Sequence, residues 1–271
     1  MRRGLLTTTA LALAVSLAGC SGQGQAPSAG PSASEAPSSH AASTEAHAST
    51  PEPGTSSAES PASPTPTSGA AAPGVEQTRD VDSAESPTVV VNKVRPLDPI
   101  DYAPTSLKAV DGVLLRTEAA EALEALRADA AAAGHRLTVL SGYRSHARQR
   151  QVYAGWVARH GGVAAADRVS ARAGHSEHQT GLAVDVGDAA APDCDLSVCF
   201  GDTEAGRWVA AHAHEHGFVV RYPAGSEPVT GFSAEPWHLR WLGPEAAAEV
   251  RAAGGVVETA FGVPAAPDYL D

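Results

Sequence analysis

Large apolar side chains are missing from a long stretch near the start of this 271-residue sequence. Between Ser21 and Gly74 there is no Leu, Ile, Val, Phe, Tyr or Trp, and small or polar residues and proline dominate. A segment of this composition cannot bury enough apolar surface to offset the entropy lost on ordering it. We therefore expect residues 21–88 to be a disordered, semi-extended linker and not a folded domain.

Positive charge is also scarce, with 19 Lys and Arg against 31 Asp and Glu and a formal net charge of −12. This balance argues against nucleic acid as a partner, because it offers no general attraction to a polyanion. Beyond the first residues, no apolar run reaches the length of a transmembrane helix. We expect a monomer with no nucleic-acid partner.

The first twenty residues have the pattern of an export signal. Arg2 and Arg3 supply positive charge, residues 5–17 are apolar but too short for a stable membrane span, and Cys20 follows small residues. This pattern resembles a bacterial lipoprotein signal, in which the cysteine becomes the acylated first residue of the mature protein. An ordinary secretory signal with an incidental cysteine is the alternative. Either reading predicts export, and the first predicts a membrane anchor at Cys20.

From residue 89 onward the composition is that of an ordinary globular domain, long enough for a proper core. Apolar spacing and glycine stops predict helices over residues 117–133, 145–160, 203–216 and 244–253. Thr117 and Ser145 are the expected N-caps of the first two. Short apolar runs predict strands at 136–140, 182–186, 218–222 and 237–242. These elements predict one mixed α+β domain over residues 89–271.

Two histidines and an aspartate have the pattern of metal ligands. His178 and Asp185 flank a glycine turn, and His238 follows about fifty residues later. Three protein ligands that leave a fourth position open suit a catalytic zinc ion, whereas four ligands would make a structural site. Glu235 remains free for acid–base work, and Arg144 supplies a cation that could face a carbonyl oxygen or a carboxylate. The sequence therefore predicts a zinc peptidase.

Three ordered motifs carry a family resemblance: Ser-Gly-Tyr-Arg-Ser at 141–145 with Gln149 and Tyr153, Ser-Glu-His-Gln-Thr-Gly-Leu-Ala-Val-Asp at 176–185, and Glu-Pro-Trp-His-Leu-Arg at 235–240. Over roughly residues 90–245 the chain resembles the D-alanyl-D-alanine carboxypeptidases of the VanY type, among the M15 metallopeptidases. The resemblance implies a hedgehog-like α+β fold with a central antiparallel sheet flanked by helices. It also implies zinc on the three ligands and the peptide stem of peptidoglycan as substrate. With the anchor at Cys20, the enzyme would face the cell wall from outside the cytoplasm.

In the mechanism we expect, zinc lowers the pKa of its water from near 16 towards ~7. Glu235 takes the proton and passes it to the leaving amine, and Arg144 helps to stabilise the oxyanion. The sequence leaves open whether Trp237 packs beneath the site or contacts substrate. The candidates for binding the stem peptide are Ser176, Gln149, Tyr153, Trp237 and, more weakly, Tyr222.

Two other clusters need an interpretation. His212 and His216 would share a helical face at zinc-binding spacing, but no third ligand follows, so we expect them to complement the helix dipole. Cys194 and Cys199 are the only cysteines of the folded part, and in an exported chain they predict a disulfide. An incomplete zinc pair is the alternative for the cysteines.

The predicted activity also has rivals. Close relatives act as L,D-carboxypeptidases on tetrapeptide stems with the same metal site, and nothing in the sequence measures that stereochemistry. A non-catalytic wall-binding module should have lost Glu235 or a ligand, and this chain has lost neither. A structural stalk protein, in which the domain serves only as a spacer, would not need so many polar residues in ordered motifs. Where relatives often carry a lysine after glycine, this chain has Ser226. If that lysine touches the substrate in relatives, we expect the substrate specificity of this chain to differ.

Overall fold

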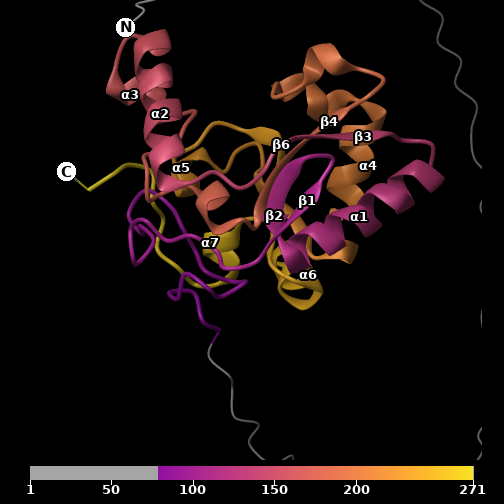
Figure 1. The fold of residues 1–271 in the computed structure, drawn as a ribbon, viewed down its shortest axis with the longest axis horizontal. Coiled ribbons are helices and arrows are strands. Elements are labelled where there is room, and N and C mark those ends of the chain that lie inside the picture. Colours follow the sequence, from indigo (N-terminus) through magenta and orange to yellow (C-terminus); the bar gives the residue numbers. More distant parts are fainter. Residues whose placement is uncertain (1–78, 271) are drawn as a thin grey trace, which may run out of the picture. The chain divides into compact units, whose positions relative to one another are not determined.

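The computed structural model describes residues 79–270, in which helices surround a four-stranded antiparallel sheet (Figure 1). The strands pair in the order β3-β4-β6-β5. They are β3 (Leu137–Ser141), β4 (Ala183–Asp188), β6 (Glu235–Trp241) and β5 (Phe218–Tyr222). The predicted α+β fold with a central antiparallel sheet is confirmed. The predicted signal peptide, Cys20 and most of the predicted linker lie outside the described residues.

The four longest helices are those that apolar spacing predicts: α1 (Thr117–Ala132), α2 (His146–His160), α4 (Glu204–His212) and α6 (Pro244–Ala252). Sequence analysis did not predict the hairpin of β1 (Leu107–Val110) and β2 (Val113–Arg116), or the short helices α3 (Val163–Ala166), α5 (Glu227–Thr230) and α7 (Val257–Ala260). Single 3-10 turns are η1 (Glu177–Thr180), η2 (Pro192–Cys194), η3 (Val198–Asp202) and η4 (Ala213–His216). No helix within residues 79–270 is long and apolar enough to cross a membrane.

Of the two predicted N-caps, Ser145 is confirmed and Thr117 is wrong. The Ser145 hydroxyl accepts a hydrogen bond from the backbone N–H of Arg148, as expected of the cap of α2. Thr117 is wrong as a cap, because α1 already begins at this residue and Arg116 occupies the N-cap position without a side-chain bond. The Thr117 hydroxyl is hydrogen-bonded instead to the hydroxyl of Ser106, in the segment before β1.

The faces of the sheet differ in chemistry because successive strand residues point to opposite sides. On one face, Val184, Val186 and Leu239 join a buried apolar cluster with Leu123 of α1 and Val209 of α4. Asp185, which alternates with the two valines, points to the other face. The sheet thus has one side that packs the core and one side that can carry a polar site.

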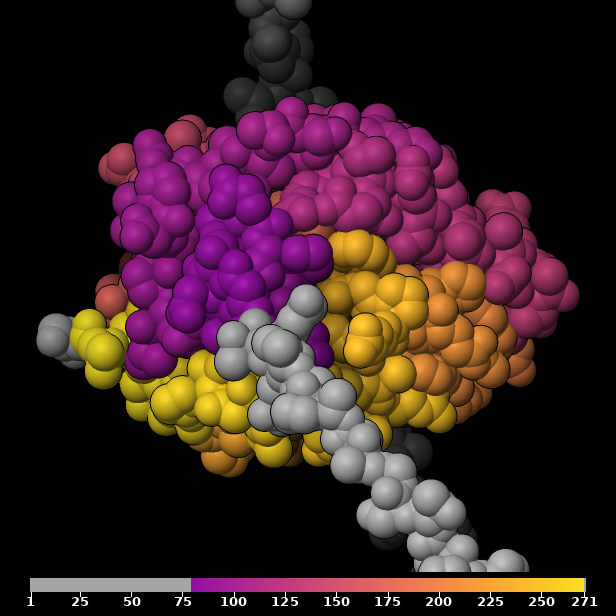
Figure 2. All heavy atoms as spheres, turned by 90° about the horizontal axis from the view of Figure 1, so that it is seen from below, coloured from indigo at the N-terminus to yellow at the C-terminus, as the bar shows by residue number. Residues whose placement is uncertain are grey.

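The domain begins earlier than the sequence predicts. Val81 packs against the apolar cluster of α6, and Ala84 is buried with Val89 in a third cluster. The Asp80 carboxylate accepts bonds from two backbone N–H groups and holds this polar stretch in a turn. Figure 2 shows the segment in indigo, lying against the C-terminal residues in yellow. The predicted linker boundary at residue 88 is therefore about ten residues too late.

Candidate active site

The register of the sheet brings the three predicted ligands together. Asp185 of β4 lies directly opposite His238 of β6, and His178 comes from η1 just before β4. One ligand atom from each side chain lies within 4.8 Å of the others, and all three residues are buried. The Asp185 carboxylate is 3.3 Å from His178 Nε2 and 3.1 Å from His238 Nδ1. Two imidazole nitrogens and a carboxylate oxygen therefore meet at one point.

His178 is oriented by the peptide backbone. Its Nδ1 lies 2.8 Å from the carbonyl oxygen of Gly142, so an N–H at Nδ1 leaves the Nε2 lone pair facing Asp185. Position 142 needs glycine, because an added Cβ would lie 2.5 Å from the carbonyl oxygen of Leu114. Burial lowers the pKa of His178, which favours the neutral ring that a metal requires.

The other two ligands are strongly coupled. Burial by itself raises the pKa of Asp185, but His178 and His238 hold it well below its usual range. Burial by itself lowers the pKa of His238, but the neighbouring carboxylates of Asp185 and Glu177 raise it to about 10. The donor set fits zinc, which favours imidazole and carboxylate ligands, and three protein ligands leave a coordination position open.

Glu235 lies beside this group without joining it. It begins β6, opposite Tyr222 of β5, and its Oε2 is 3.8 Å from His238 Nδ1. Burial raises the pKa of Glu235 to about 7, and the Asp185 charge adds to the rise, while His238 and Arg144 oppose it. A carboxylate poised near neutral pH is suited to accept and return a proton.

Arg144 is held in place beside the same group. Its guanidinium donates to Ser141 Oγ at 2.9 Å and to Gln149 Oε1 at 2.8 Å. Burial lowers the pKa of Arg144, and the charges of Asp185 and Glu235 oppose that effect. The predicted cation therefore lies within the electrostatic reach of both the ligand group and the predicted base.

The structure corrects the role predicted for Gln149. Its side chain is buried, its oxygen accepts from Arg144, and its nitrogen donates to the carbonyl oxygen of Ala171. With both ends of the amide in use, Gln149 supports Arg144 and is not free to bind substrate.

The remaining predicted substrate residues have different surroundings. Tyr153 donates a 2.6 Å hydrogen bond to Asp167, which also pairs with Arg172. Ser176 is buried at the start of η1. Trp237 packs against the apolar cluster and so lies beneath the site. The prediction that it contacts the substrate is corrected accordingly. The ring of the weaker candidate Tyr222 lies beside His238, with centroids 5.2 Å apart.

His212 and His216 do not form a second metal group. His212 Nδ1 contacts Glu215 at 3.1 Å, whereas His216 Nε2 contacts Asp129 of α1 at 3.2 Å. Within residues 79–270, the group described above is the one set of three potential ligands close enough to share an ion.

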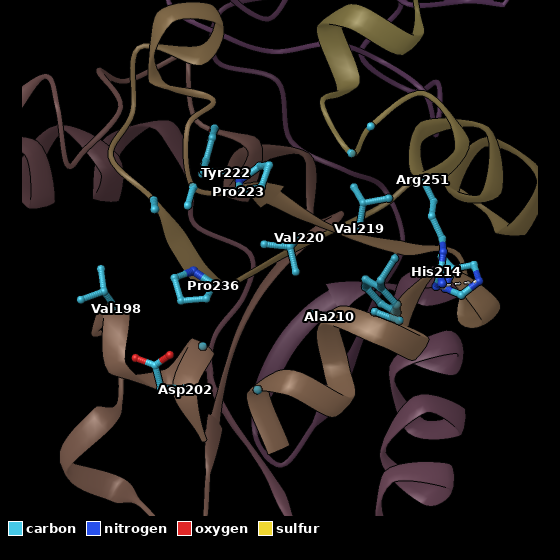
Figure 3. A pocket seen from close by; sticks show the side chains of 18 residues that line it. Val198, Asp202, Ala210, His214, Val219, Val220, Tyr222, Pro223, Pro236 and Arg251 are labelled. Atoms are coloured by element: carbon cyan, nitrogen blue, oxygen red, sulfur yellow. Dashed lines mark hydrogen bonds between the residues drawn. The ribbon is translucent and has the colours of Figure 1, made fainter. Parts of the chain in front are cut away.

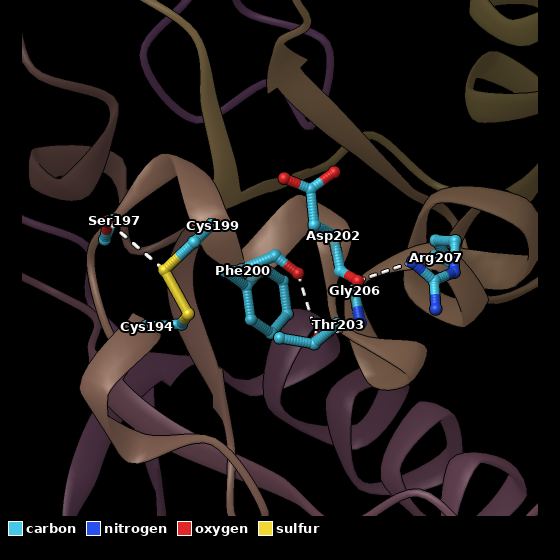
Figure 4. The surroundings of a disulfide bond; sticks show 8 residues. All are labelled: Cys194, Ser197, Cys199, Phe200, Asp202, Thr203, Gly206 and Arg207. Carbon is cyan, nitrogen blue, oxygen red and sulfur yellow. Dashed lines mark hydrogen bonds between the residues drawn. A yellow bond between two sulfur atoms is a disulfide. The ribbon is translucent and has the colours of Figure 1, made fainter. Parts of the chain in front are cut away.

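The two cysteines of the folded part lie next to each other in space. The structure places the sulfur atoms of Cys194 and Cys199 at bonding distance, with Cα atoms 5.4 Å apart (Figure 4). Phe200, which follows the second cysteine, is fully buried in the main core. The cysteine pair thus closes the loop that leads from β4 to α4.

A cavity of about 670 Å³ lies along β5, the edge strand of the sheet (Figure 3). Val219 and Val220 line it, with Pro236 near one end and Arg251 beside His214 at the other. The three ligands, Glu235 and Arg144 are not among its lining residues. This cavity is therefore adjacent to the reactive group but separate from it.

A buried ionic network, which no sequence motif predicted, lies behind His238. Arg221 of β5 and Arg240 of β6 both donate to the Glu177 carboxylate, at 2.8 and 2.9 Å. Arg221 also pairs with Glu258 of α7. A signal was present, because an arginine inside the apolar run Phe218–Tyr222 must find a buried partner, but the sequence does not say which one.

Comparison with known proteins identifies the family. Residues 112–244 match the family model described as VanY, D-alanyl-D-alanine carboxypeptidase. The putative carboxypeptidase YodJ of Bacillus subtilis (strain 168) is 36% identical over 183 residues, which cover 64% of this chain and 66%, just under two thirds, of the relative. It is one of several curated relatives that this chain spans only in part.

Two solved structures are similar in fold and in sequence. A vancomycin-resistance D,D-pentapeptidase VanY in complex with Zn(II) has a TM-score of 0.55 and 31% identity, over 64% of this chain and 97% of the other. The L,D-carboxypeptidase DacB of Streptococcus pneumoniae has a TM-score of 0.56 and 40% identity, over 67% and 89%. The protein belongs to the VanY family of D-alanyl-D-alanine carboxypeptidases.

Proposed function

We propose that this protein is a zinc-dependent carboxypeptidase that removes the C-terminal D-Ala from peptidoglycan stem peptides. The observation that carries the proposal is the buried group of His178, Asp185 and His238, with Glu235 beside it but outside it. The family match and the Zn(II) complex of the similar VanY structure support the same conclusion. His178, Asp185 and His238 hold the metal, which supplies Lewis acidity for activating water and polarising the scissile carbonyl.

Glu235 performs the proton transfers. It accepts a proton from the attacking water as the water's oxygen bonds to the carbonyl carbon, and then donates that proton to the nitrogen of the leaving D-Ala. A pKa of about 7 lets one carboxylate serve in both directions. Its distance from the ligand group keeps its oxygens available for this work.

Arg144 stabilises the negative charge that develops on the carbonyl oxygen. Its guanidinium is already fixed by Ser141 and Gln149, so little reorganisation is needed as charge develops. Ser176, two residues before His178, and Tyr153 of α2 contribute to binding the stem peptide.

L,D-carboxypeptidase activity on tetrapeptide stems is the second candidate, and the similarity to DacB favours it. The test is incubation of the purified protein with pentapeptide and tetrapeptide stems, followed by mass spectrometry of the products. Loss of D-Ala from the pentapeptide alone supports the first candidate, and trimming of the tetrapeptide supports the second. A chelator-treated sample is the control, and equal cleavage in that sample contradicts zinc dependence.

The protein acts outside the cytoplasm as a lipoprotein. This part of the proposal rests on the pattern of the first twenty residues, in which Cys20 receives the lipid. Two acyl chains on one anchor hold a protein stably at a membrane. Cys194 and Cys199 form their disulfide in the oxidising environment reached on export. Replacing Cys20 by Ser should release the protein to the medium, and membrane retention of this variant would contradict the anchor.

A further inference from the structure

One ring nitrogen of His238 faces a buried carboxylate on the side away from the ligand group. Nδ1 points to Asp185, and Nε2 lies 3.6 Å from Glu177 Oε2. Within residues 79–270, His238 Nε2 and Glu177 Oε2 are among the buried side-chain atoms that have no hydrogen-bond partner at ordinary distance. A small approach of the two would satisfy both, and leaving both unpaired would cost free energy.

Glu177 is fixed from behind by two arginines. Its Oε1 accepts from Arg221 Nε at 2.8 Å and from Arg240 Nη1 at 2.9 Å, which leaves Oε2 for His238. Burial by itself raises the pKa of Glu177, but Arg221, Arg240 and His238 hold it well below its usual range. Glu177 is therefore a carboxylate with one oxygen directed at the histidine.

The arginines are themselves anchored by distant parts of the chain. Arg240 donates through Nη2 to the carbonyl oxygens of Pro87 and Val89, in the segment that begins the domain. Arg221 makes two hydrogen bonds with Glu258 of α7, at 2.7 and 2.9 Å. The network thus reaches from both ends of the domain to the back of His238.

The four charged side chains of the network balance one another. Glu177 and Glu258 carry two negative charges, and Arg221 and Arg240 carry two positive charges. All four side chains are almost completely buried, so any uncompensated charge among them would be costly. The network therefore carries no net charge of its own where Glu177 meets the ring of His238.

We propose that Glu177 is a positioning residue for the metal: it accepts the Nε2–H of His238 and so presents the Nδ1 lone pair to the ion. This inference rests on the zinc site of the proposed function. His178 has a weaker hydrogen-bond acceptor than His238 has, because its Nδ1–H is accepted by the neutral carbonyl oxygen of Gly142. A carboxylate makes the ring a stronger donor than a carbonyl does, so His238 is the more basic of the two imidazole ligands.

The affinity test compares two variants of the mature protein in competition with a chromogenic zinc chelator. Substituting a residue that accepts a hydrogen bond from a metal-ligating histidine costs about 10–100-fold in metal affinity. We expect a loss of that size for Glu177→Gln. Glu258→Gln is the matched control, because it removes the same charge from the same network without touching His238. We expect its folded form to bind zinc nearly as well as the wild type. Thermal unfolding of each variant defines the temperature at which both are folded.

A second measurement does not depend on any variant. In the wild-type protein with labelled histidines and NMR-active cadmium, coupling to the metal should appear at Nδ1 of His238 and Nε2 of His178. The proton of His238 should reside on Nε2. Coupling at Nε2 of His238 would overturn the proposal, even if Glu177→Gln failed to fold.

The outcomes separate this inference from the function on which it rests. A wild-type protein that binds no metal would contradict the proposed zinc site itself. Normal zinc affinity in a folded Glu177→Gln protein would overturn the positioning role while leaving the enzyme intact. Equal losses in the two variants would also overturn it, because the effect would then come from the network's stability and not from contact with His238.

Discussion

On one face of the central sheet, Val184 and Val186 pack with α1 and α4, and on the other face Asp185, which lies between them, contacts His178 and His238. The same strand therefore supplies core and site in alternation. The apolar face is held by many interchangeable contacts, whose loss is graded. The polar face depends on a few buried charges that must all be paired.

This difference predicts how each face should fail. A small cavity on the apolar face should lower the free energy of unfolding and leave the chemistry unchanged in molecules that remain folded. A single change on the polar face should remove function, or leave a buried charge without its partner. The following experiments test that division, from the largest expected effect to the smallest.

Replacing His178 by Ala should abolish both zinc binding and cleavage, because the site would keep two of its three ligands. Elemental analysis and hydrolysis of a stem pentapeptide measure the two effects. His212→Ala is the matched control, since its ring contacts Glu215 and stacks on Trp208, outside the ligand group. Full zinc in the His178 variant, with loss of zinc in the control, would place the metal elsewhere.

Replacing Glu258 by Gln should lower the free energy of unfolding by about 3–5 kcal/mol, because Arg221 would lose one of its two buried carboxylate partners. Burial by itself raises the pKa of Glu258, but Arg221 and Asn92 lower it below its usual range. A depressed pKa contributes stability that is present above the unfolded pKa of ~4.3 and is lost as the pH falls towards the folded value. Urea unfolding at neutral and acidic pH should therefore show the difference from wild type shrinking in acid. A difference that grows in acid would contradict this account.

Replacing Leu123 by Ala should cost about 2–5 kcal/mol, because it opens a cavity between α1 and the apolar face of the sheet. Zinc affinity and turnover per folded molecule should stay close to wild type. Urea unfolding, a zinc titration and a stem-peptide assay on the same preparation provide the three numbers. A large loss of zinc affinity in the folded variant would show that the two faces are not separable.

Replacing Ser145 by Ala should cost about 0.5–2 kcal/mol, since it removes the hydroxyl that caps α2. Thr117→Ala is the comparison at the start of α1, where the hydroxyl contacts Ser106 and caps nothing. We expect a smaller cost there, measured by thermal unfolding. Equal costs at the two positions would mean that capping is not the source of the effect.

The periodicity of apolar residues was enough to predict the four sheet strands and the four longer helices. It did not reveal α3, α5 or α7, because four residues are too few for a helical period. It also placed residues 79–88 in the linker, since their polar composition hides the turn that Asp80 stabilises and the burial of Ala84. Strands β1 and β2 have four residues each and were missed for the same reason as the short helices.

In the site too, some residues could be predicted from the sequence and others could not. The motifs pointed to His178, Asp185, His238, Glu235 and Arg144, and the structure brings these side chains together. Their supports were not visible in the sequence. The partner of a buried charge is chosen by tertiary structure, so nothing local could join Glu177 to an arginine 44 or 63 residues away. Gln149 was expected to face the substrate because its bond to the carbonyl oxygen of Ala171, 22 residues away, is likewise set by the tertiary structure.

The central claim is that Glu235 is the proton acceptor and not a metal ligand, and Glu235→Gln tests it most directly. The variant should keep a zinc content equal to wild type, because Glu235 lies outside the ligand group. Its turnover of a D-Ala-terminated stem pentapeptide should fall by about 10²–10⁴-fold, because an amide cannot accept the proton of water. Near-normal turnover would mean that another group activates the water. Loss of zinc would mean that Glu235 binds the metal, and either result would contradict the division of roles described above.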